Sequence, residues 1–120
     1  MEALKTYFEE KFKGVLSAGS GFSQNAGVSF WIDLEKLKKF LEAAKADKQF
    51  GLHYLEAMTV LEIDSKKILT LFLRSQEDPR PFVLRSDITK KKTLPAMTSL
   101  YTNSKAFERE LSSSEGVRFE

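Results

Sequence analysis

The chain has 120 residues, of which 42% are hydrophobic and 30% charged, with a net charge of +2 and no cysteine. This length and composition are typical of a soluble globular protein, so we expect residues 1–120 to form a single domain with one core. The lack of cysteine excludes disulfides, thiolate catalysis and cysteine-ligated zinc or iron–sulfur centres, and the small net charge gives no indication of nucleic-acid binding.

Two features bear on location and contacts. The N-terminal residues 1–5 include an early acid and no apolar segment, so they do not predict a secretory signal, and no apolar run approaches the roughly 18 residues that span a bilayer. We therefore expect a cytoplasmic protein. Every Arg lies in residues 61–120, and because Arg is favoured at interfaces, we expect the contact surface in the C-terminal half.

The first element in chain order is an amphipathic helix that ends at Gly14. Its apolar positions recur at helical spacing between charged residues: Leu4, Tyr7, Phe8 and Phe12. Val15-Leu16 then predicts a short strand. Residues 17–25 are rich in small side chains, and Gly19-Ser20-Gly21 is similar to the start of a glycine-rich phosphate loop. Because no strand–turn–helix unit surrounds it, we interpret this stretch as a flexible connection.

A strand and a helix follow. Val28–Ile32 has the β-branched and aromatic residues of a strand, and Asp33 stands at the position of a helix N-cap. The stripe that predicts the second helix comprises Leu34, Leu37, Phe40, Leu41 and Ala44. The charged residues between these positions predict a solvated outer face.

Three apolar segments then predict a meander of strands: Leu55–Ile63, Ile68–Leu73 and Phe82–Arg85. Turn residues separate them, at Asp64–Lys67 and at Ser75–Pro79. Together with the preceding helices, these strands predict an α+β fold. We expect two layers, with helices packed on a mixed, mostly antiparallel sheet.

The C-terminal segment predicts one or two short helices. Its apolar positions are Leu94, Met97, Leu100, Tyr101, Phe107 and Leu111. Pro95 fits the first turn of such a helix. Before it, Lys90–Lys92 is the densest run of charge, and without flanking aromatic residues we interpret it as a solvated loop and not as a site for phosphate or lipid head groups.

Candidate catalytic residues are few. His53 is the only histidine, and alone it cannot assemble a histidine-rich metal site, so we expect a partly buried, hydrogen-bonded side chain. Acids occur in pairs at Glu9-Glu10, Glu77-Asp78 and Glu108/Glu110. The last pair flanks Arg109, which favours two ionised carboxylates and does not suit a general acid. A small hydrolase or transferase would need a pocket lined by His53 and carboxylates.

The end of the chain carries a spaced pattern. Glu108-Arg109-Glu110 is preceded by Phe107 and followed, after five residues, by Gly116, Val117 and Phe119. With the helix-and-meander order upstream, this pattern resembles an accessory-subunit family of bacterial NADH-quinone oxidoreductase (respiratory complex I), which includes the related protein of membrane-bound hydrogenases. That family ends in E-R-E, two variable residues, D-[ML]-[FY] and G-[IV]-x-F. The resemblance covers about residues 30–119.

The resemblance implies a non-catalytic scaffold subunit of the peripheral arm. Such a subunit binds no cofactor and packs beside the quinone-site subunit, so its contact with the inner membrane is indirect, through the complex. The implied motif residues are Phe107, Glu108, Arg109, Glu110, Gly116, Val117 and Phe119. From the residues themselves, Arg109 pairs either with a carboxylate of its own chain or with one of a neighbour, and Phe119 either anchors a partner or closes the domain's own core.

An alternative function follows from the departures from the family pattern. Ser113-Ser114-Glu115 stands where the family has Asp-Met-Phe or a close variant, Ala106 stands where a Trp is common, and the sequence ends at Glu120, where the family usually continues. These departures favour a stand-alone interaction module that no longer assembles into the complex.

Overall fold

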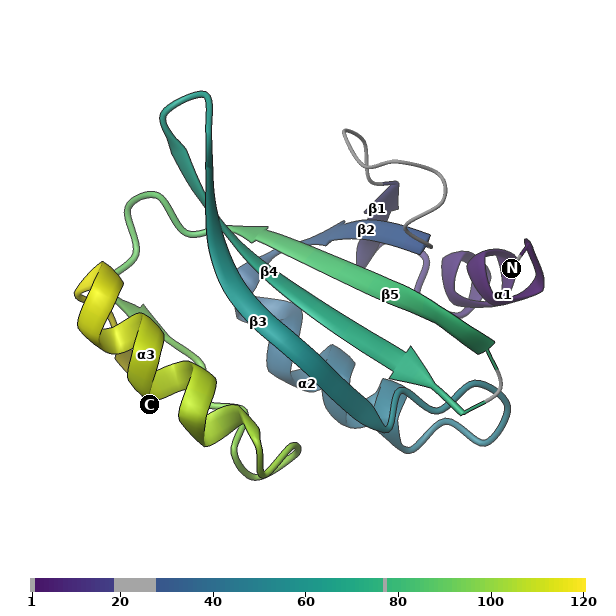
Figure 1. Ribbon diagram of the computed structural model, residues 1–120. Helices are drawn as coiled ribbons and strands as arrows, with labels where there is room; N and C mark the ends of the chain where they lie inside the picture. Colours follow the sequence, from purple (N-terminus) through teal and green to yellow (C-terminus); the bar gives the residue numbers. More distant parts are fainter. Residues whose placement is uncertain (1, 19–27, 77) are drawn as a thin grey trace.

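The computed structural model describes residues 2–18, 28–76 and 78–120, and within these ranges the chain forms three helices and seven strands (Figure 1). In chain order they are α1 (Glu2–Lys11), β1 (Leu16–Ala18), β2 (Val28–Ile32), α2 (Leu34–Lys45), β3 (Tyr54–Ile63), β4 (Lys66–Ser75), β5 (Asp78–Asp87), β6 (Thr93–Leu94), α3 (Ser104–Glu115) and β7 (Arg118–Phe119). The connection predicted around Gly19-Ser20-Gly21 lies outside the described residues.

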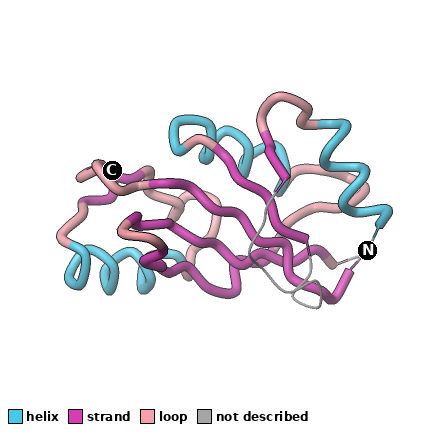
Figure 2. Tube along the Cα trace, turned by 90° about the horizontal axis from the view of Figure 1, so that it is seen from above, coloured by secondary structure: helices cyan, strands magenta, loops and turns pink. Residues whose placement is uncertain are grey.

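The main sheet has the strand order β1-β2-β5-β4-β3. Strand β2 runs parallel to β5, and the other neighbouring strands are antiparallel. The predicted α+β class, with a mixed and mostly antiparallel sheet, is therefore confirmed. So is the meander, since β3, β4 and β5 are neighbours in sequence and in space. Figure 2 shows α3 apart from α1 and α2, and Figure 1 shows that α3 runs alongside the edge strand β3.

The strands are longer than the apolar segments that predicted them. Strands β3, β4 and β5 each have ten residues, because polar residues at their ends still pair across the sheet, as Glu62 does with Lys67. The turn between β3 and β4 shortens to Asp64 and Ser65, both with positive φ, of 51° and 66°. Two left-handed residues make a tight hairpin whose twist matches that of the strands.

Helix α2 forms where its apolar stripe predicts it. Leu37, Phe40, Leu41 and Ala44 are buried, and the charged residues between them are mostly exposed. Asp33 occupies the N-cap position with extended backbone angles, but its side chain makes no capping hydrogen bond. It instead lies 3.8 Å from the ammonium of Lys36, and both side chains are largely exposed.

An aromatic cluster joins α1 and α2 to the sheet. The ring of Phe82 on β5 lies 4.9 Å from Phe8 of α1, 5.4 Å from Phe30 of β2 and 6.3 Å from Phe40 of α2, measured between centroids. Phe8, Phe30 and Phe82 are essentially fully buried. Burying a large apolar side chain contributes about 1.5–3 kcal/mol, so this cluster is a major source of the core's stability.

The C-terminal segment differs from its prediction at one point. Pro95 does not open a helix, because Thr93–Leu94 pairs as strand β6 with β7 and the chain leaves this pair in an extended course. Met97 and Tyr101 are buried, yet they flank a turn in the loop before α3, which begins only at Ser104. The apolar residues that predicted a helix here belong instead to a loop that packs against the core.

Hydrogen bonds to Asp47 connect α1 to the loop after α2. Its buried carboxylate accepts hydrogen bonds from the Tyr7 hydroxyl (2.7 Å), from the Lys11 ammonium, and from the backbone N–H groups of Gln49 and Phe50 (both 2.8 Å). Burial alone would raise the pKa of Asp47, but the hydrogen bonds from Lys11, Phe50, Tyr7 and Gln49 outweigh it and lower the pKa to about 2. The carboxylate is therefore more acidic in the folded chain than in the unfolded one.

Asp47→Asn is expected to lower the free energy of unfolding at pH 7 by about 1–2 kcal/mol, because the amide cannot accept from Lys11 and Tyr7 as the carboxylate does. A depressed pKa contributes stability above about pH 4 that is lost as the pH falls from about 4 to about 2. The difference between wild type and variant should therefore shrink over this range in urea unfolding experiments. Asp33→Asn, which removes an exposed carboxylate, is the control and should change stability by less than about 0.5 kcal/mol.

Candidate functional site

The closing segment of the chain, residues 104–120, is α3 followed by a turn and β7. Gly116 ends the helix in the left-handed conformation, with φ of 69°, and its N–H donates to the Ser112 carbonyl (3.1 Å). A side chain is strained at this φ, which explains a Gly at this place in the pattern. The Ser112 hydroxyl donates to the Val117 carbonyl at 2.6 Å and closes the turn.

Beyond Gly116 the chain returns to its own domain. Strand β7 runs parallel to β6, with the Arg118 N–H donating to the Lys92 carbonyl (2.9 Å) and the Glu120 N–H to the Leu94 carbonyl (3.0 Å). Val117 is buried, and the half-buried Phe119 packs against the core. Of the two roles considered for Phe119, the structure shows the contact with its own core.

Glu108 is buried, although it belongs to a charged triplet. Its carboxylate accepts hydrogen bonds from the Met97 N–H (2.8 Å), the Thr98 hydroxyl (3.2 Å) and the Ser104 hydroxyl. All three donors are uncharged; two lie in the segment that leads into α3, and Ser104 is the first residue of the helix. Glu108 therefore holds this segment against the helix, which is a structural role within the chain.

Arg109 and Glu110 lie on the other side of the helix. Both are exposed, as are Ser113 and Ser114 one turn later. Successive helical residues are rotated by about 100°, so a charged triplet cannot place all its members on one face. Among the described residues Arg109 forms no ion pair. Glu108 is therefore separated from the exposed Arg109 and Glu110, and whether Arg109 contacts a partner stays a prediction.

The structure also shows the surroundings of the residues that depart from the family pattern. Glu115 lies 3.0 Å from the ammonium of Lys67 on β4, so it ties the end of α3 to the sheet. Ser113 and Ser114 are exposed beside Arg109 and Glu110. The altered residues therefore either support the fold or belong to the outward surface.

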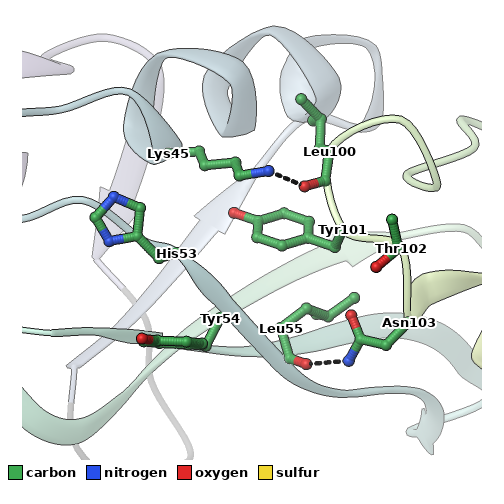
Figure 3. A pocket seen from close by; sticks show the side chains of 8 residues that line it. All are labelled: Lys45, His53, Tyr54, Leu55, Leu100, Tyr101, Thr102 and Asn103. Atoms are coloured by element: carbon green, nitrogen blue, oxygen red, sulfur yellow. Dashed lines mark hydrogen bonds between the residues drawn. The ribbon is translucent and has the colours of Figure 1, made fainter.

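A depression of about 290 Å³ lies between the end of α2, the start of β3 and the segment before α3 (Figure 3). His53 lines it, but none of the described lining residues is acidic, and the described residues contain no group of His, Asp and Glu suited to a metal. His53 is also exposed, not partly buried as expected. The condition for a hydrolase or transferase, His53 together with carboxylates, is not met in the described part of this depression.

Tyr101 is a buried residue that lines the depression. Its hydroxyl donates to the Leu52 carbonyl at 2.6 Å, and burial raises the pKa of Tyr101 well above its usual value, so the phenol stays neutral. Asn103 donates from its amide to the Leu55 carbonyl at 2.7 Å. The apolar spacing of this segment does not predict these two contacts, because the partners of Tyr101 and Asn103 are 49 and 48 residues away in the chain.

The geometry defines a small α+β domain whose C-terminal helix and strand close on its own core while one helical face points outward. Residues 30–120 match the family described as "Respiratory-chain NADH dehydrogenase, 30 Kd subunit", and the chain belongs to this family. The resemblance inferred from the spaced C-terminal pattern is confirmed. A search of the curated proteins gave no match.

Two of the solved structures that are similar to this chain illustrate the shared fold. One comes from the membrane-bound sulfane sulfur reductase, an archaeal respiratory membrane complex, with a TM-score of 0.80 and 18% identity over 99% of this chain and 69% of that chain. The other is the trypsin-resistant fragment (1-134) of Nqo5, with a TM-score of 0.70 and 20% identity over 100% of this chain and 96% of that chain. At these identities the likeness shows a shared fold. None of the described helices has the length and apolar character needed to cross a membrane.

Glu108→Ala is expected to lower the free energy of unfolding by about 2–4 kcal/mol, because it leaves the Met97 N–H and two hydroxyls without their acceptor. Glu108→Gln keeps one acceptor oxygen and should lose less. The matched control is Glu110→Ala, which removes an exposed carboxylate two positions away and should change stability by less than about 0.5 kcal/mol. Denaturant unfolding measures all three, and equal losses for Glu108→Ala and Glu110→Ala would contradict the role of Glu108.

Proposed function

We propose that this chain is a non-catalytic scaffold subunit in the peripheral arm of a complex I-type NADH-quinone oxidoreductase or a related respiratory or hydrogenase complex. In this proposal it binds no cofactor and packs beside the quinone-site subunit. The observation that carries the proposal is the family match over residues 30–120. The chemistry of the chain agrees with it, since a chain without cysteine and with one exposed His offers no ligand set for an electron-carrying cluster.

The outward face of α3 supports a contact with another subunit. Lys105, Arg109 and Glu110 are exposed there, while the opposite face of the helix is held by Glu108 and Leu111. An Arg guanidinium can form two parallel hydrogen bonds with a carboxylate, which gives a contact both strength and orientation. Because the inner face is already occupied within the chain, the outer face is the one that α3 can offer to a neighbour.

The test is purification of the tagged chain from its native membranes in mild detergent, with mass spectrometry of the proteins that accompany it. A scaffold subunit should recover the cluster-bearing and quinone-site subunits of one complex. The isolated chain should show no flavin or iron–sulfur absorbance and should not oxidise NADH. An isolated chain that oxidises NADH would overturn the proposal.

The second candidate, a stand-alone interaction module, is favoured by Ser113 and Ser114, which replace larger family residues on the exposed side of α3. The same purification separates the two functions. If no respiratory or hydrogenase subunit accompanies the chain, the stand-alone module is the better description.

Arg109→Ala is expected to lower the yield of the assembled complex several-fold and to leave the melting temperature of the isolated chain unchanged, because Arg109 is exposed. Complex that still forms should turn over normally per assembled unit. Lys39→Ala is the control, since it removes an exposed cation from α2. A normal yield of complex with reduced turnover would show instead that Arg109 has a catalytic effect.

A further inference from the structure

The depression beside α3 contains a cation without an anionic partner in the described part of the chain. Lys45, at the end of α2, is half-buried, and its ammonium donates to the Leu100 carbonyl. The same nitrogen lies 5.2 Å from the centroid of the Tyr101 ring. In Figure 3 the Lys45 side chain extends above this ring toward Leu100, and His53 lies on the side of the ring opposite Leu100.

This environment stabilises only part of the ammonium charge. An ammonium has three N–H donors, and one carbonyl accepts one of them. The face of an aromatic ring adds a modest attraction, of about 0.5–2 kcal/mol. Among the described residues, Lys45 makes no ion pair and no carboxylate lines the depression. A partly desolvated cation gains from an anion that enters beside it.

Two other lysines of this chain show the contrast. Lys11 has the buried carboxylate of Asp47, and Lys67 has Glu115 at 3.0 Å. Both of those lysines are neutralised within the domain, each by an acid from a distant part of the sequence. Lys45 differs from both, because its described surroundings provide a carbonyl dipole and an aromatic ring but no negative charge.

The surroundings of Lys45 are also held in place. The Tyr101 hydroxyl is fixed by the Leu52 carbonyl at 2.6 Å, and Asn103 is fixed by the Leu55 carbonyl at 2.7 Å. A preorganised site loses less conformational entropy when a ligand binds. At the rim, the Tyr54 side chain is 44% exposed and is one of two large hydrophobic residues so exposed among the described residues. Exposed aromatic residues are enriched at protein interfaces.

We propose that this depression docks an acidic side chain, Asp or Glu, of a neighbouring subunit. The carboxylate lies against the ammonium of Lys45, and the chain on either side of it contacts the ring of Tyr54. The inference rests on the proposed function, because the acidic residue belongs to a subunit of the same complex. It adds a second contact surface, separate from the outward face of α3.

The experiment is a zero-length cross-link in the purified complex. A carbodiimide joins an amine to a carboxylate only when the two are in contact, so mass spectrometry should find Lys45 linked by an amide to an Asp or Glu of another subunit. The pair Lys67–Glu115, at 3.0 Å within the chain, is the internal positive control. Lys48→Arg, which alters an exposed lysine close to the same helix end, should leave the Lys45 link unchanged.

Two variants separate charge from reactivity. Lys45→Arg keeps the positive charge but cannot form the amide, so the link should disappear while the yield of complex stays within about twofold of wild type. Lys45→Met keeps the apolar stem and removes the charge, so the link should disappear and the yield should fall about tenfold, the equivalent of one lost ionic contact. Melting temperatures of the isolated variants show whether either change acts through folding instead.

The outcomes are distinguishable. A complex that forms and gives the Lys67–Glu115 link, but in which Lys45 is unlinked or joined to an acid of its own chain, overturns this inference and leaves the proposed function intact. A normal yield with Lys45→Met also overturns it. A tagged chain that recovers no respiratory or hydrogenase subunit overturns the proposed function, and this inference with it.

Discussion

The burial of Phe82 is the constraint on which the arrangement of the domain depends. This one ring, on the central strand β5, touches aromatic residues from α1, β2 and α2. Three segments that are separate in sequence thereby share one apolar environment, and their relative positions follow from packing around it. Leu37, Leu41 and Ala44 of α2 extend the same core along the sheet, and the Asp47 hydrogen bonds connect α1 to the loop after α2.

The C-terminal third is organised by polar contacts instead. Glu108 accepts hydrogen bonds that hold the segment from Met97 to Ser104 against α3. Gly116 turns the chain so that β7 can pair with β6. Both residues belong to the motif that marks the family. Their roles explain why such a motif mixes positions that build the domain with positions, such as Arg109, that are available to other proteins. Such a motif contains both residues that stabilise the fold and residues that form an exposed surface.

Much of the fold is predictable from local patterns. The stripe of α2, the strand Val28–Ile32 and the meander each follow from periodicity within a short window, and all three are present in the structure. The parallel pairing of β2 with β5 is not predictable in this way, because no local pattern specifies which distant strand becomes a neighbour. The helix predicted at Pro95 does not form for a related reason. The residues just before Pro95 are extended because they pair with the distant strand β7, and local preference does not indicate this pairing.

The candidate site, too, is predictable only where local patterns in the sequence specify it. The spacing from Glu108 to Phe119 identified the family from sequence alone. The burial of Glu108 could not be predicted, because a triplet of charges is normally solvated and its three uncharged donors are Ser104 of the same helix and two residues of the preceding loop, 10 and 11 positions earlier. The environment of Lys45 depends on Leu100 and Tyr101, about 55 residues away, and no spacing in the sequence relates them.

One last consequence concerns the chain before it meets any partner. A sheet with open edges is a template for aggregation, and a long edge strand such as β3 is the greater hazard. Here the pairing of β3 with β4 is interrupted by a bulge between Leu55 and Ala57, and the Asn103 amide occupies the Leu55 carbonyl. The opposite edge, β1, is only three residues long. These features shorten the stretch of regular open edge at which a strand of another chain could pair.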